Sequence, residues 1–176
     1  MPNDNESAFS LVLTDPAAWC QMGDRMMTAA RLLWTASLAN DDLLKPSLAG
    51  APEFQARMDL LWPAALVLGF SAENFVKAAH IKTLGLGNSG QPERRLPKPL
   101  SRHDLAVIAK DTGLPFTERE LELLKRMTSI VKWAGRYPVP NKSEEPLNLT
   151  IMHSDDLATL ALIRARVFAF LGLKAT

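Results

Sequence analysis

The sequence of 176 residues has a single cysteine and only three histidines. One cysteine cannot form a disulfide within the chain or a thiolate zinc site, so neither can hold this domain together. Cys20 lies among apolar residues of a predicted helix, which favours a buried thiol over a nucleophile. The histidines His80, His103 and His153 are far apart and no pair has the spacing of metal ligands. We therefore expect no metal site and no cofactor.

The chain also has little net charge and no long apolar run. Its net charge of +1 does not by itself predict a nucleic-acid or membrane partner. The most apolar stretch, residues 60–70, contains Pro63 and is too short to cross a bilayer. Residues 1–10 lack the basic start and apolar run of a signal peptide. We expect a cytoplasmic protein without a membrane partner.

Hydrophobic residues make up 47% of the chain, and in five segments they recur at steps of three and four, which is the spacing of a buried helix face. The predicted helices cover residues 15–39, 53–84, 102–111, 117–134 and 154–172. The helix over 53–84 is apolar on all sides between 60 and 70, which predicts a central position, and Pro63 should bend it. We predict an all-α fold, a five-helix bundle with a long, bent central helix. Residues 1–14 are predicted to be a flexible N-terminus and residues 15–176 a single domain.

Local signals place several of the helix ends. Thr117 followed by Glu120 is a capping box, in which a hydroxyl and a carboxylate each bind a free backbone N–H. Ser101 is the expected cap of the helix over 102–111, with Asp104 as an acidic residue in its first turn. Gly172 is the expected stop of the last helix.

Three motifs follow one another in an order typical of a known family. They are Ser71-Ala72-Glu73-Asn74-Phe75-Val76-Lys77, then His103-Asp104-Leu105, then Trp133-Ala134-Gly135-Arg136-Tyr137-Pro138. This set resembles the HEPN family of small helical bundles, which have an "AE…LK" helix, an "HDL" helix start and a closing "RYP" turn. The resemblance covers roughly residues 55–140 and implies a HEPN-like fold.

Elementary chemistry gives each motif residue a role. Glu73 and Lys77 are four residues apart on one helix face, and inside a buried helix they need partners from other segments. His103 and Asp104 stand at a helix start, where the helix dipole favours a carboxylate. Arg136 follows a glycine and precedes a proline-fixed turn, so it can form a bidentate pair with Glu73 or with a ligand phosphate.

The resemblance implies a homodimer that binds RNA, a nucleotide or a cognate partner protein. The expected ligand-binding residues are Glu73, Lys77, His103, Asp104, Arg136 and Tyr137. Catalytic family members are ribonucleases marked by an arginine and, four to six residues later, a histidine. Arg136 has no histidine in that range, which favours binding without catalysis. The alternative is a divergent metal-independent endoribonuclease, of toxin or defence type, that uses His103 and Arg136.

A basic loop is the best candidate for contact with nucleic acid. Its basic residues are Arg94, Arg95, Lys98 and Arg102. Four positive charges in nine residues can bind phosphates, but no aromatic side chains lie between them to stack on bases. A solvated loop is therefore the competing interpretation. A third possibility is a helical assembly protein in which the motif residues serve only folding.

Overall fold

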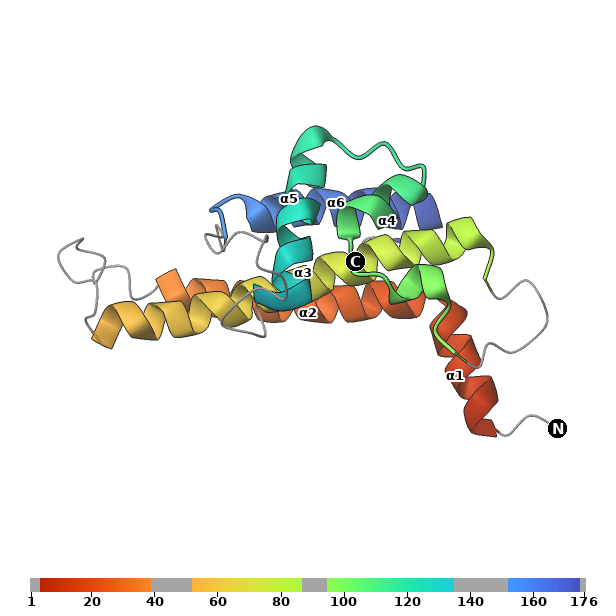
Figure 1. The fold of residues 1–176 in the computed structure, drawn as a ribbon, viewed down its shortest axis with the longest axis horizontal. Helices are drawn as coiled ribbons and strands as arrows, with labels where there is room; N and C mark the ends of the chain where they lie inside the picture. The colour runs from red at the N-terminus through yellow and green to blue at the C-terminus, as the bar shows by residue number, and fades with distance from the viewer. Residues whose placement is uncertain (1–3, 39–51, 87–94, 135–151, 175–176) are drawn as a thin grey trace.

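The computed structural model describes residues 4–38, 52–86, 95–134 and 152–174. Within these ranges there are six α-helices and no strand, which confirms the all-α prediction (Figure 1). The helices are α1 (Asp4–Thr14), α2 (Pro16–Leu38), α3 (Pro52–Leu84), α4 (Leu105–Asp111), α5 (Glu118–Ser129) and α6 (Asp156–Leu171). A short 3₁₀ helix, η3 (Lys98–Ser101), precedes α4, and a π-helical turn, η4 (Ile130–Ala134), continues α5.

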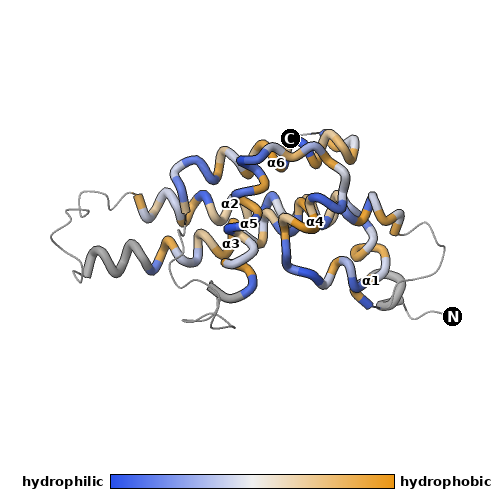
Figure 2. The backbone as a smooth tube through the Cα atoms, turned by 45° about the horizontal axis from the view of Figure 1, so that its top comes forward, coloured by the Kyte–Doolittle hydropathy of each residue, from blue (hydrophilic) through white to orange (hydrophobic). Residues whose placement is uncertain are grey.

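The long helix α3 is the centre of the bundle, as its sequence predicts. It runs alongside α2 as an antiparallel pair, and α4, α5 and α6 also pack on it (Figure 1). Leu68, Phe75 and Val76 of α3 are fully buried. Along the helices in Figure 2, hydrophobic and hydrophilic stretches alternate, as expected of helices that bury one face. The helix continues through Pro63, the residue at which we expect a bend.

Several helix ends coincide with their sequence signals. Thr117 and Glu120 form the predicted capping box at the start of α5. Gly172 ends α6 with a positive φ of 74°, a conformation that glycine adopts without a steric penalty. The cap of α4 differs from the prediction, because the residue that caps it is Asp104 and not Ser101. Ser101 instead belongs to η3, where its hydroxyl donates to the carbonyl of Lys98.

Helix α1 lies in a segment for which the sequence predicts no helix. It extends away from the body of the bundle in Figure 1. Buried Leu13 packs at its C-terminal end, and the Leu13 carbonyl accepts a hydrogen bond from Trp19 Nε1 at 3.1 Å. This tertiary contact supports a helix that has no strong start signal. None of the helices in the described part of the chain is both long and apolar enough to cross a membrane.

Candidate functional site

Glu73 and Lys77 form an ion pair in the interior of the bundle. Lys77 Nζ lies 2.5 Å from Glu73 Oε1, and the two residues are only 3% and 7% exposed. The four-residue spacing places them on one face of α3, as predicted. Because two charges lose most of their hydration here, the pair is favourable only if further groups bind the carboxylate and the ammonium. Partners from outside α3 are therefore needed.

His103 supplies the first of these partners. It lies between η3 and α4, and its Nδ1 is 2.9 Å from Glu73 Oε1, the same oxygen that binds Lys77. A carboxylate only accepts hydrogen bonds, so Nδ1 is protonated and its N–H donates the hydrogen bond to Glu73. The imidazole is thereby held in one orientation, while 46% of its side chain remains exposed. The structure thus brings together three of the predicted site residues.

Trp19 of α2 approaches the Lys77 ammonium from a second helix. The Lys77 ammonium lies 6.0 Å from the centre of the Trp19 ring, at the limit of a cation–π contact. The indole N–H of Trp19 binds the end of α1, so α1, α2 and α3 all meet at this cluster. The only signal for Trp19 was its helical spacing, which does not identify a partner on α3.

Asp104 has a structural role next to this cluster. Its Oδ1 accepts the backbone N–H of Val107, and its Oδ2 lies 3.8 Å from Lys132 Nζ. Thr128 of α5, which sequence reasoning missed, accepts the N–H of Leu105 through its hydroxyl at 2.9 Å. These bonds fix the first turn of α4. They therefore hold the preceding residue, His103, against α3.

The basic loop is only partly available for a ligand. Arg102 donates to Asp111 Oδ2 at 2.6 Å, so its charge is already paired. Arg95 and Lys98 are exposed, and no carboxylate of the described residues pairs with them. Both precede His103 by fewer than ten residues. Two cations of the predicted segment, which precedes His103 in the sequence, are therefore open to solvent.

The remaining predicted site residues lie outside the described part of the chain. These residues are Arg94, Arg136 and Tyr137. The proposed pairing of Arg136 with Glu73 stays a prediction. In the described residues, Glu73 Oε1 accepts hydrogen bonds from the Lys77 ammonium and the His103 imidazole.

One group of side chains has the spacing of metal ligands, at the start of α6. The candidate ligand atoms of His153, Asp155 and Asp156 lie within 4.8 Å of one another. Asp156 is buried and already accepts both Arg126 Nη atoms, at 2.5 and 3.0 Å, as well as the N–H of His153. Asp155 pairs with Arg119. A hydrogen bond from its own backbone, with a smaller contribution from the Arg119 guanidinium, holds the pKa of the Asp155 carboxyl below its usual range. Both carboxylates are therefore already paired with an arginine.

Cys20 is buried in the packing of α2, as its sequence context predicts. Desolvation, with a smaller contribution from Asp24, raises the pKa of the thiol to about 12. The thiolate is the reactive form of cysteine, so this side chain is inert at neutral pH.

His80 is a buried histidine, three residues beyond Lys77 on α3. It is 3% exposed, and neither ring nitrogen has a hydrogen-bond partner among the residues that the structure describes. Burial lowers its pKa from the ordinary value of 6.5, opposed in part by Asp111 and reinforced by Arg102. At a pH just below 6.5, the His80 imidazole therefore stays neutral in the folded protein but binds a proton in the unfolded chain.

His80 should make the fold sensitive to acid. Because its pKa is lower in the folded state, the unfolded state binds more protons, and the free energy of unfolding falls as the pH drops below 6.5. In His80→Leu and His80→Gln, we expect the free energy of unfolding to depend less on pH than it does in the wild type. Urea unfolding between pH 7.5 and 5 measures it. Parallel curves for the wild type and both variants would contradict the assignment.

No family model, curated protein or solved structure matches this chain. The resemblance to the HEPN family therefore stays a prediction that rests on the three motifs.

Proposed function

We propose that this chain is a HEPN-like binding module that takes a phosphate-bearing ligand, RNA or a nucleotide, at His103. The observation that carries the proposal is the contact of His103 Nδ1 with the buried carboxylate of Glu73. Since Nδ1 is engaged, Nε2 is the nitrogen that can meet a ligand, and it has no hydrogen-bond partner among the described residues. A protonated imidazole held in this way donates to a phosphate oxygen.

The surroundings of His103 support an anionic ligand. Arg95 and Lys98 are exposed cations on the segment that leads to it, and phosphate binding by such residues releases counterions from the nucleic acid. Two further cations, Arg102 next to His103 in the sequence and Lys132 beside Asp104, already pair with carboxylates. In this proposal the module works as a cytoplasmic homodimer, and the ligand lies along the segment from 95 to 103.

The test is binding of a labelled single-stranded RNA of mixed sequence, measured by fluorescence anisotropy between 50 and 200 mM salt. Removing the two free cations in Arg95→Gln/Lys98→Gln should weaken binding. It should also reduce the slope of log K against log salt by about 0.7 for each lost phosphate contact. His103→Gln should weaken binding without changing the fold, because its side chain is half exposed.

The matched control is Arg25→Gln/Lys174→Gln, which removes two exposed cations from other parts of the surface. Both double variants change the net charge equally, so only a local site distinguishes them. Absence of RNA and nucleotide binding by the wild type would overturn the proposal. Equal losses of RNA affinity in the two double variants would show a general effect of net charge, and would also overturn the proposal.

A second candidate function is metal-independent RNA cleavage, with His103 as general base. An imidazole whose Nδ1 is bound by a carboxylate and whose other nitrogen is free has the arrangement of a general base. It would take the proton of a ribose hydroxyl, while Arg136 would be the predicted partner for the phosphate. A denaturing gel of the same RNA distinguishes the two functions. Cleavage that falls about 10²-fold or more in His103→Gln would favour the enzyme.

A further inference from the structure

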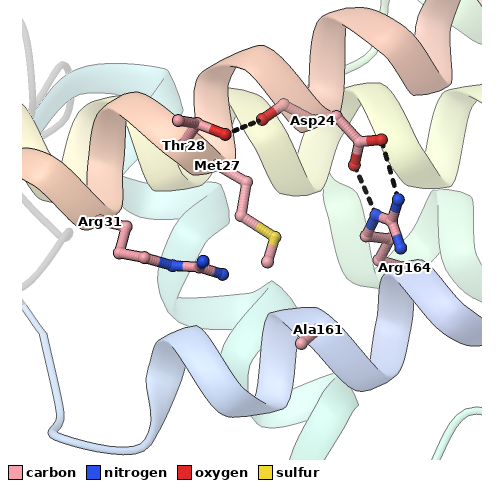
Figure 3. A pocket seen from close by; sticks show the side chains of 6 residues that line it. All are labelled: Asp24, Met27, Thr28, Arg31, Ala161 and Arg164. Carbon is pink, nitrogen blue, oxygen red and sulfur yellow. Dashed lines mark hydrogen bonds and ion pairs between the residues drawn. The ribbon is translucent and has the colours of Figure 1, made fainter. Parts of the chain in front are cut away.

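A cavity between α2 and α6 lies apart from the His103 cluster. It has a volume of about 410 Å³, which is within the usual range for small-molecule sites. Its lining residues are Asp24, Met27, Thr28, Arg31, Ala161 and Arg164. Figure 3 shows that Met27 extends from α2 into this space, with Ala161 on the facing wall of α6. The thioether and the methyl group give the cavity an apolar part.

The cavity also carries one rigid ion pair. Arg164 Nε and Nη2 donate to the two oxygens of Asp24 at 2.5 and 3.0 Å. The Arg164 guanidinium also lies 4.1 Å from the centre of the Phe168 ring, which holds its plane in place. These contacts neutralise the charge of Asp24, and they leave Arg164 unavailable to a ligand. The pair forms a fixed wall and leaves no net charge.

Arg31 supplies the charge that is not neutralised. It lies two turns after Asp24 on α2, and its guanidinium points into the cavity beside the end of the Met27 side chain (Figure 3). No carboxylate among the described residues pairs with it. The cavity thus combines a free planar fork of N–H donors with an adjoining apolar wall.

We propose that this cavity binds a small organic carboxylate with an apolar body. The Arg31 fork matches the two oxygens of a carboxylate, and Met27 and Ala161 receive the hydrocarbon. A phosphate dianion fits less well, because the one free guanidinium balances only one of its two negative charges and the Asp24–Arg164 pair adds no net positive charge. The proposal is independent of RNA binding at His103.

The test is a titration of the isotope-labelled protein with hexanoate, followed by amide chemical shifts in an NMR spectrum. We expect saturable shifts for the amides of Met27 and Ala161. Arg31→Gln should weaken hexanoate binding at least about tenfold, the usual effect of losing a hydrogen bond to a charged group. Arg25→Gln, an exposed arginine on the same helix outside the cavity, should leave the affinity unchanged.

Three further probes test each part of the ligand. Hexan-1-ol has the apolar body without the charge, acetate has the charge without the body, and inorganic phosphate is the competing anion. Each should bind at least about tenfold more weakly than hexanoate. The proposal is overturned if hexanoate gives no saturable shifts or binds Arg31→Gln equally well. It is also overturned if any of the three probes binds as tightly as hexanoate.

Discussion

Glu73→Ala should destabilise the fold by about 3–5 kcal/mol, the cost of leaving one partner of a buried ion pair without its counter-charge. The orphaned group is the Lys77 ammonium, which is 3% exposed and cannot reach water from its place in α3. His103 loses its bond to Oε1 at the same time, but its ring is half exposed and can bind water instead. Urea unfolding followed by circular dichroism measures the loss of unfolding free energy.

Glu122→Ala is the matched control, since Glu122 also forms a helical ion pair, with Lys125. That pair is exposed on both sides, so its loss should leave stability almost unchanged. A loss in Glu73→Ala as small as that in Glu122→Ala would show that Lys77 finds water or another partner. In that case the buried position of Lys77 would not carry the energetic cost expected for an unpaired ammonium.

The double variant Glu73→Leu/Lys77→Met separates folding from function at the same site. Replacing a buried ion pair by apolar residues of similar volume is often neutral, or stabilising by about 1–4 kcal/mol. If the double variant folds as well as the wild type, the charges are not needed to form the bundle. Loss of RNA binding in such a stable variant would then assign Glu73 to the positioning of His103. Unchanged RNA binding would remove that role.

The sequence predicts helices well where a signal is local. The hydrogen bonds of the capping box at Thr117 and of the glycine stop at Gly172 lie within a few residues of each helix end, so the pattern and the structure agree. Helix α1 has no such signal, and its anchor is the bond from Trp19 to Leu13 across a helix junction. A contact between two helices is not encoded in the periodicity of either one.

The contrast between local signals and contacts between helices also decides how much of the site could be predicted. The pairing of Glu73 and Lys77 follows from their spacing on one helix. The contact of His103 with Glu73 joins residues thirty positions apart, and only the family resemblance suggested that they meet. The Asp24–Arg164 pair joins residues 140 positions apart, and no motif in the sequence relates them. Contacts of this kind depend on how α2, α3 and α6 pack.

Gly23 lies in a close contact between α2 and α3, and Gly23→Ala should destabilise the fold by about 1–3 kcal/mol through overpacking. Its carbonyl accepts a hydrogen bond from the buried hydroxyl of Ser71 at 2.8 Å, so α2 lies directly on α3. A Cβ at position 23 would lie 2.7 Å from Cε1 of Phe75, a distance that real Cβ atoms essentially never show. Phe75 is fully buried and meets Phe168 edge-on, so the ring has little room to move.

The opposing effect is helix propensity, since alanine in a helix interior is favoured over glycine by about 0.8–1 kcal/mol. A double-mutant cycle with Phe75→Leu separates the two contributions. Leucine at position 75 removes the ring edge, so Gly23→Ala should then be neutral or slightly stabilising in that background. Thermal and urea unfolding of the four proteins measure the coupling. Equal destabilisation by Gly23→Ala in both backgrounds would mean that Phe75 does not set the spacing of α2 and α3, the two helices that bring Trp19 and Lys77 together.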